Sequence, residues 1–331
     1  METPKTLLEA IQYFSDEQVC IDAVAAMRWP DGKPKCPECW SKEAYYLKTQ
    51  KRWKCRECRI QYSVKRGTIF EGSPIPLAKW LPAMWLLVNC KNGISSYELA
   101  KDLGITQKSA WFVLHRLRLV VKTPGTAIKF GSNDGGEVEV DESFVGGKIK
   151  NMHRSRAMKL GQVKQASGYE TRVHNENKTV VFGIFDRESR QVRAKVVPNV
   201  KRETLQNEIL KNVKYGSAIY SDQAVAYDDL RCRYIHDTVN HAEAYVKGRV
   251  HTNSLENFWS LMKRNLSGTY VAVEPFHLDR YLDEQMFRFN NRATKDNPLD
   301  DADRFLLALS QVANKHLTYA ELTGKTERPE A

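Results

Sequence analysis

Three acidic side chains alternate with valines in the segment EVEVDESFVGGK, residues 137–148. In a β-strand successive side chains point to opposite faces, so Glu137, Glu139 and Asp141 would share one face. Three carboxylates on one face are costly unless they are solvated, paired or neutralised by a cation. The segment therefore indicates either an exposed edge strand or a strand that ends at a metal site.

Two further carboxylates follow elements that could carry them to the same place. Residues 217–220 predict a short buried strand, and Ser221 and Asp222 follow at its end. Glu256 lies early in the predicted helix HTNSLENFWSLMKRNL, off its apolar stripe. Because Asn253 stands three residues earlier, Glu256 could instead complete a capping box, in which its side chain bonds a backbone N–H. Both interpretations of Glu256 stay open at this point.

Four of the seven cysteines form two Cys-x-x-Cys pairs separated by 15 residues. This spacing lets two loops place four thiolates tetrahedrally around one zinc ion, and four thiolates leave no open position for chemistry. We therefore predict one structural zinc ion in a zinc ribbon, with a redox pair as the alternative. The predicted ligands are Cys36, Cys39, Cys55 and Cys58.

The composition favours an intracellular protein with a polyanionic partner. The 331 residues can form two or three domains, and the apolar content of 42% suffices for ordinary cores. The 51 lysines and arginines exceed the 40 acidic residues, and the resulting formal charge of +11 suits a partner such as nucleic acid. We find no signal-peptide pattern, and the longest apolar stretch, LPAMWLLV, is too short to span a bilayer.

Basic residues gather around the second cysteine pair. Residues 48–66 contain eight lysines and arginines against the single acid Glu57, with Trp53 and Tyr62 among them. Such a segment could be an ordinary solvated face, but next to a zinc-stiffened module it favours contact with phosphates. The residues predicted to bind DNA here are Lys51, Arg52 and Lys54.

The segment ISSYELAKDLGITQKSAWFVLHRLRLVV has helix-turn-helix spacing. One helix would begin at Ser96, Gly104 would make the turn, and Thr106 would cap a second helix. This arrangement would place Gln107 and Lys108 at the start of a recognition helix, where base edges are reached. An ordinary helical hairpin explains the same pattern.

The elements around the acids suggest how one sheet could bring them together. Residues 179–186 and 191–197 predict two strands joined by a tight turn, which would form a meander with the strand that contains Asp141. A predicted helix at 204–213 and the strand at 217–220 follow. The order strand, strand, strand, helix, strand is that of the ribonuclease H fold, whose first and fourth strands are parallel neighbours.

These residues together resemble the bacterial insertion-sequence transposases of the DDE class that have an N-terminal zinc ribbon and a ribonuclease H-like core. The resemblance covers nearly the whole chain and rests on VDESFVGG at Asp141, YSDQAVAY at Asp222 and TNSLENFWSLMKR at Glu256. It implies that these three acids are catalytic and bind two Mg²⁺ or Mn²⁺ ions. Some members of the group carry Asn at the third position, so Asn253 and Asn257 are alternatives to Glu256.

The resemblance also implies a reaction and partners. Carboxylates suit Mg²⁺, and two such ions support phosphodiester cleavage by a water molecule, followed by attack of the freed 3′-hydroxyl on target DNA. The expected partners are the terminal inverted repeats, target DNA and further copies of the chain. Lys263 and Arg264 would contact the transposon end, and residues 148–172 would form a basic arm along the DNA backbone. The expected location is the cytoplasm, at the nucleoid when DNA is bound.

We predict an α+β multidomain protein. Its parts would be N-terminal helices (1–30), a zinc ribbon (31–66), a helix-turn-helix region (67–122), a linker (123–136), a ribonuclease H-like catalytic domain with a mixed sheet (137–275), and C-terminal helices with a tail (276–331). We expect the C-terminal helices to cover the catalytic core. Two other functions stay open: a DNA-binding regulator derived from a transposase, and a ribonuclease H-like nuclease without strand transfer.

Overall fold

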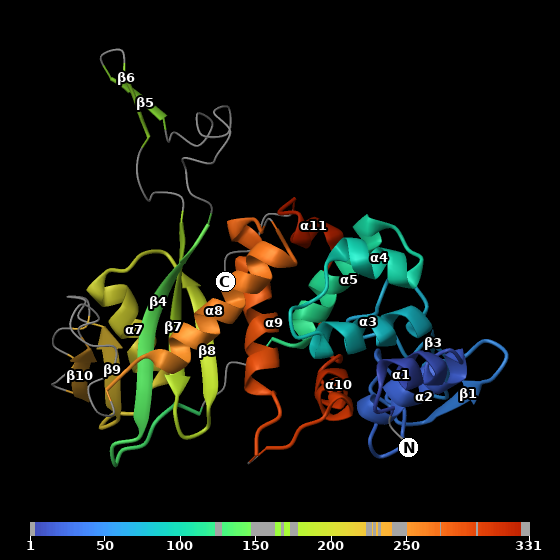
Figure 1. The fold of residues 1–331 in the computed structure, drawn as a ribbon. Coiled ribbons are helices and arrows are strands. Elements are labelled where there is room, and N and C mark those ends of the chain that lie inside the picture. The colour runs from blue at the N-terminus through green and yellow to red at the C-terminus, as the bar shows by residue number, and fades with distance from the viewer. Residues whose placement is uncertain are drawn as a thin grey trace. The chain divides into compact units, whose positions relative to one another are not determined.

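The protein divides into two compact units, which are described separately (Figure 1). The computed structural model describes residues 4–122, 128–146, 163–166, 169–172, 178–222, 227, 230, 233–239, 250–271, 273–295 and 297–325. Unit 1 consists of Met1–Pro124, Asn265–Ala272 and Asp283–Ala331, and unit 2 of Gly125–Arg264 and Val273–Leu282. The boundary falls inside two helices, α8 (Asn253–Gly268) and α9 (Leu278–Asn290). No helix in the described part of the chain is long and apolar enough to cross a bilayer.

Unit 1 combines helices with a small sheet around one hydrophobic core. Its elements are α1 (Leu7–Tyr13), α2 (Glu17–Arg28), β1 (Ala44–Leu47), β2 (Arg52–Cys55), β3 (Gln61–Tyr62), α3 (Leu77–Asn89), α4 (Ser96–Leu103), α5 (Gln107–Val120), α10 (Asp301–Leu309) and α11 (Tyr319–Leu322). The strands form an antiparallel sheet in the order β1-β2-β3. Cys36 and Cys55 lie in the same core cluster as the buried residues of α2 and α3, so the ribbon shares its core with the neighbouring helices.

The aromatic residues of the basic segment have a structural role. Trp53 and Tyr62 are buried and pack with Trp29, the residue after α2, with centroid distances of 5.1 Å from Trp29 to Trp53 and 6.4 Å from Trp29 to Tyr62. Trp53 and Tyr62 are therefore neighbours of lysines and arginines in the sequence, but their side chains point into the core. Neither ring is exposed to meet a DNA strand.

The predicted helix pair is confirmed, together with its turn and caps. Ser95 and Glu98 form a capping box at the start of α4, and Gly104 has the left-handed conformation that the turn requires. The side chain of Thr106 caps α5. The second half of α5 is buried from residue 113 to residue 118, so only its N-terminal turns are accessible to a partner.

The prediction that the C-terminal helices cover the catalytic core was wrong for α10. This helix packs against α3 within unit 1, where Phe305 contacts Phe14 and Trp85 at centroid distances of 5.4 Å. An apolar stripe predicts that a helix face is buried, but it does not identify the surface that buries it.

Unit 2 contains a five-stranded mixed sheet in the order β10-β9-β4-β7-β8. Its strands are β4 (Glu137–Val145), β7 (Thr179–Asp186), β8 (Gln191–Val197), β9 (Ala218–Asp222) and β10 (Ile235–Val239). Strands β4, β7 and β8 pair antiparallel, whereas β9 is parallel to both β4 and β10. The predicted meander and the predicted parallel pair are confirmed, and β10 is an additional strand. The mixed α+β class with a zinc-ribbon module is likewise confirmed.

Two helices cover opposite faces of this sheet (Figure 1). Val138 and Val140 of β4 belong to a core cluster with Leu205 and Ile209 of α7 (Arg202–Asn212). Because side chains alternate along β4, Glu137, Glu139 and Asp141 face the other side, which α8 covers. The basic residues 148–172 lie outside the described residues, except for the antiparallel pair β5 (Val163–Ala166) and β6 (Tyr169–Arg172).

Candidate functional site

The register of two parallel strands brings the first two predicted acids together. Glu139 of β4 is the partner of Tyr220 of β9, and the same register continued by two residues sets Asp141 beside Asp222. Asp141 and Asp222 lie two residues after Glu139 and Tyr220, respectively, so their side chains point to the same face as those residues, which is the face that α8 covers. The two carboxylates therefore meet at the carboxyl end of the parallel pair.

A third carboxylate in this group is Glu142, which the sequence analysis did not identify. Ligand oxygens of Asp141, Glu142 and Asp222 all lie within 4.8 Å of one another. Strict alternation assigns Glu142 to the opposite face from Asp141, which is why it was missed. However, β4 continues beyond the last residue of β9, so side chains from both faces of β4 can approach Asp222 at this edge.

Burial makes the first two of these carboxylates weaker acids. Burial raises the pKa of Asp141 to about 6; the indole of Trp259 opposes this rise by donating a hydrogen bond, whereas the charges of Asp222 and Glu256 add to it. Burial also raises the pKa of Glu142 to about 7, against the hydrogen bond from the hydroxyl of Tyr227, whose oxygen lies 2.5 Å from Oε1. A divalent cation would offset the repulsion, and carboxylate oxygens are its preferred ligands, so this donor set fits Mg²⁺ or Mn²⁺.

Glu256 lies near this group but outside it. Its side chain is exposed on the first turn of α8, and its charge acts on Asp141. Thr252 Oγ1 lies 3.5 Å from Glu256 Oε1, a long hydrogen bond. Asn253 is the first residue of α8. Both Asn253 and Asn257 are exposed. The assignment of a third ligand among Glu142, Glu256 and these asparagines therefore stays a prediction.

The other two acids of β4 hold the surrounding structure. Glu139 is fully buried, and its Oε2 accepts the backbone N–H groups of Ser254 at 3.0 Å and Leu255 at 3.2 Å. Its Oε1 accepts a hydrogen bond from Arg187 Nε at 2.8 Å. Glu137 accepts the hydroxyl of Tyr220 at 3.0 Å. Glu137, Glu139 and Asp141 thus share one face as predicted. Glu139, however, provides the negative charge at the N-terminus of α8.

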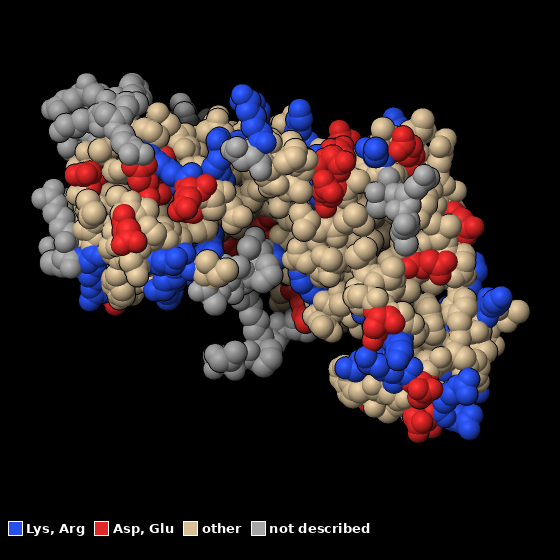
Figure 2. Space-filling view, turned by 90° about the horizontal axis from the view of Figure 1, so that it is seen from below, with Lys and Arg blue, Asp and Glu red and all other residues tan. Residues whose placement is uncertain are grey.

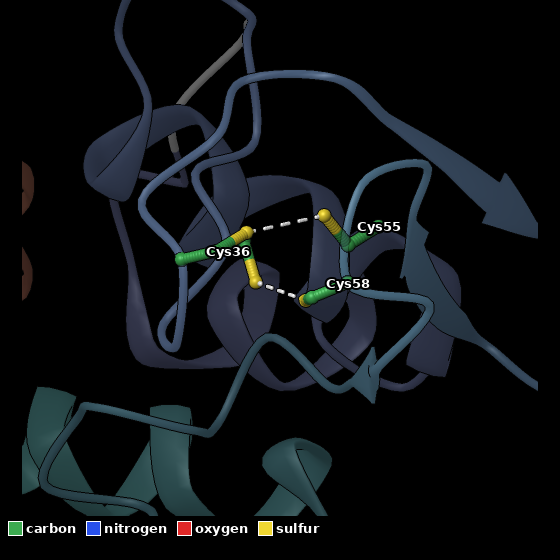
Figure 3. A group of neighbouring side chains, drawn as sticks. Cys36, Cys55 and Cys58 are labelled. Carbon is green, nitrogen blue, oxygen red and sulfur yellow. Dashed lines mark hydrogen bonds between the residues drawn. The ribbon is translucent and has the colours of Figure 1, made fainter.

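The four predicted zinc ligands converge from two loops (Figure 3). The Sγ atoms of Cys36 and Cys58 are 3.5 Å apart, as are those of Cys39 and Cys55. Four sulfurs bound to zinc at about 2.3 Å in a tetrahedron would lie about 3.8 Å apart, so these sulfurs fit the ion closely. The residue after each pair has a left-handed backbone, with φ of 62° at Trp40 and 63° at Arg59. The two loops therefore bend in the same way around one site.

The predicted DNA-binding residues differ in their surroundings. Lys51 forms an ion pair with Glu17 at 2.5 Å, and Gln107 donates to Ser96 Oγ at 2.9 Å. The ammonium of Lys108 lies 4.8 Å from the ring centroid of Tyr319. The exposed residues are Arg52, Lys108, Lys263 and Arg264, and Lys54 is half-buried. On the face shown in Figure 2, lysines and arginines form separate groups among acidic residues.

Two family models match the chain over the regions that contain these sites. Residues 135–290 match the ISXO2-like transposase domain, which belongs to the DDE type, and residues 15–61 match the transposase zinc-ribbon domain. The first match includes the acids of β4, Asp222 and Glu256, and the second includes all four cysteines.

A curated relative matches most of the chain. It is described as an uncharacterized protein in transposable element ISH50 of Halobacterium salinarum, and it is 26% identical over 284 residues, which are 82% of this chain and 90% of the relative. Among solved structures, a chain of the simian T-cell lymphotropic virus intasome in complex with PP2A regulatory subunit B56 gamma matches 68% of this chain and 74% of its own length, at 13% identity and a TM-score of 0.30. A similarity at that level supports no argument about this protein.

Proposed function

Because the chain belongs to the DDE-class insertion-sequence transposases with an N-terminal zinc ribbon, we propose that unit 2 cleaves DNA at the ends of an insertion sequence and joins those ends to target DNA. The observation that carries this proposal is the meeting of Asp141 and Asp222 at the end of one parallel strand pair, with Glu142 within ligand distance. A transposase needs divalent cations held beside a phosphodiester, and this is where the described residues can hold them.

Each side chain has a distinct part in the proposal. Asp141 and Asp222 hold the cations, and Glu256 supplies the third carboxylate from α8, as the family resemblance implies. Bound Mg²⁺ would activate the attacking oxygen and stabilise the leaving oxygen. Glu142 is the competing third ligand, because its carboxylate oxygen lies within 4.8 Å of those of Asp141 and Asp222.

DNA would be held by residues outside this group. Lys263 and Arg264 are exposed and lie about two turns after Glu256 on α8. From this position they would contact the DNA strand that is cleaved. Arg52, Lys54 and Lys51 on the ribbon would contact phosphates, and Gln107 and Lys108 would contact the duplex from the start of α5. Zinc would maintain the ribbon and take no part in the reaction.

A strand-transfer assay tests the proposal. The full chain is incubated with Mg²⁺, a duplex that ends in the inverted repeat flanking its gene, and a target plasmid. We expect cleaved and joined products, and we expect Asp141→Asn and Asp222→Asn to lose both. Asp237→Asn is the matched control, because Asp237 is an exposed carboxylate on β10 of the same sheet.

The product pattern distinguishes the rival functions. Cleavage without joining would leave a nuclease of this fold, whereas specific binding of the repeat without either reaction would indicate a regulator. Either result would reject strand transfer as the function of this chain.

A further inference from the structure

The indole of Trp259 donates a hydrogen bond to Asp141, which the proposed function makes a ligand of the catalytic cations. Its Nε1–H donates to Asp141 Oδ2 at 2.9 Å, and the ring is buried, with 4% of its surface exposed. A buried indole needs an acceptor for its N–H, and this one uses a charged group. The sequence pattern alone indicates no role for this tryptophan beyond helix packing.

Strand β7 is shaped to receive this ring. Gly183 is the ladder partner of Asp141, and a Cβ atom there would lie 2.5 Å from Cζ2 and 2.7 Å from Cη2 of Trp259. A third atom, Leu255 Cδ2, would lie at 3.1 Å. Glycine inside a strand costs roughly 0.5–1 kcal/mol relative to alanine, and it often marks a close approach of another group. Here the approaching group is the indole, so Gly183 leaves the space that lets Trp259 reach Asp141.

Helix α8 links this contact to the predicted third ligand. Trp259 follows Glu256 by three residues, so the two side chains are neighbours on one helix face. The start of the same helix is held by Glu139, through the backbone N–H groups of its first turn. Three hydrogen bonds therefore fix α8 against the strand that contains Asp141: two from its first turn to Glu139, and one about a turn later to Asp141.

From this geometry we infer that Trp259 is a positioning residue for the cation site, and that Gly183 is required for it to act. The indole engages Oδ2 of Asp141 and would thereby orient the carboxylate so that Oδ1 could bind a cation. Partners of this kind orient metal ligands, and their loss typically weakens metal affinity about 10- to 100-fold. The inference rests on the proposed function, because it requires that Asp141 bind a divalent cation.

Mn²⁺ binding to the full chain without DNA tests the inference. We expect Trp259→Phe, which keeps an aromatic ring but removes the N–H, to weaken Mn²⁺ binding about tenfold or more in calorimetry. Gly183→Ala should weaken it comparably although Trp259 is still present. Trp85→Phe is the matched control, because Trp85 is buried in the core of unit 1 and should lose stability without losing Mn²⁺ affinity.

A spectroscopic measurement separates positioning from packing. In ¹⁵N-labelled protein, Mn²⁺ should broaden the indole N–H signal that Trp259→Phe removes, and Mg²⁺ should shift it, because that N–H is bonded to a metal ligand. Wild-type Mn²⁺ affinity in Trp259→Phe would overturn the inference while leaving the proposed function intact. A wild-type chain that binds no Mn²⁺ and cleaves no DNA would instead reject the proposed function, and the inference with it.

Discussion

The carboxylate of Glu139 accepts the backbone N–H of Ser254, so a buried acid near the start of strand β4 caps a helix that lies 115 residues further along the chain. The same carboxylate bonds Leu255 N–H and Arg187 Nε. A strand and a helix that each contribute an acid to the proposed site are thereby connected without any metal. Glu139 is thus the side chain on which the position of α8 depends most directly.

Replacing Glu139 should loosen this connection. In Glu139→Gln the amide NH₂ would face either the guanidinium of Arg187 or the N–H groups of Ser254 and Leu255, so a donor replaces an acceptor at one of these contacts. Breaking a buried ion pair typically costs about 3 to 5 kcal/mol, and we expect a loss of that order in denaturant unfolding of unit 2. Cleavage should fall as well. Glu137→Gln is the control, because the Glu137 side chain is more exposed and lies 3.4 Å from Arg187; an equal loss there would argue against the special role of Glu139.

Removal of zinc should affect more of the chain than the ribbon. Structural zinc contributes about 10 to 16 kcal/mol of binding free energy in small zinc domains, comparable to or larger than the whole stability of a typical domain. Because Cys36 and Cys55 share the core of α2 and α3, Cys36→Ser should raise hydrogen exchange in all of these elements. The sheet of unit 2 should keep its protection.

Metal analysis accompanies that exchange measurement. We expect about one zinc ion per chain in the wild type and a large loss in Cys36→Ser. The control is Cys90→Ser, because Cys90 is a free cysteine outside the cluster of four. Full zinc content in Cys36→Ser, or equal exchange in both variants, would contradict the assignment.

The stability of the metal-free protein should fall as pH rises toward neutrality. The pKa of Asp141 is raised to about 6 and that of Glu142 to about 7, above the values of about 4 expected in the unfolded chain. Between these values the folded state binds more protons than the unfolded state, so the free energy of unfolding decreases with increasing pH. Each unit of pKa difference corresponds to about 1.4 kcal/mol, so the fall should amount to a few kcal/mol between pH 4.5 and 7.5, a range chosen around these values.

Chelator-treated protein provides the measurement. Denaturant unfolding of unit 2 at several pH values should show this slope, and saturating Mg²⁺ should remove it, because the cation binds the deprotonated carboxylates. The double variant Asp141→Asn with Glu142→Gln should also flatten the slope. A slope unchanged by the double variant would assign the pH dependence to other groups.

The sequence predicted elements with strong local patterns well. Residues 179–186 and 191–197 were predicted as strands with the observed bounds, because apolar residues end there at turn-forming residues. Thr106 and Gly104 marked helix ends by capping chemistry that needs no tertiary partner. The spacing of the cysteines predicted their cluster for a similar reason, since one ion sets the geometry.

Features that depend on distant partners were not predictable in the same way. Glu142 was missed because alternation describes a continuous sheet, whereas β9 ends beside Asp141. Gly183 could be noticed in its strand, but the ring that needs its space lies on a helix far along the chain. The apolar stripe of α10 correctly predicted that one face of the helix is buried. The surface that buries it is α3, and not the catalytic core as expected. In each case the missing information was which surface lies opposite.

The last prediction separates the two candidates for the third carboxylate. Glu256→Gln keeps the length of the side chain and an oxygen acceptor, so local bonds at the start of α8 survive while the charge that would bind a cation is lost. If Glu256 is a ligand, this variant should retain thermal stability and DNA binding, yet lose cleavage by about 100-fold or more. Glu142→Gln should keep the hydrogen bond from Tyr227, gain stability from the removal of a buried charge, and lose cleavage only about tenfold.

The opposite order of cleavage losses, measured with Mg²⁺ on the same inverted-repeat duplex, would transfer the ligand role to Glu142. If Glu256 serves only as a local bonding partner at the start of α8, Gln should be nearly neutral in stability and cleavage, whereas Glu256→Ala should cost about 0.5 to 2 kcal/mol, as lost helix caps do. Near wild-type cleavage by both Gln variants would exclude both glutamates and direct the search to Asn253 and Asn257, which flank Glu256 on α8.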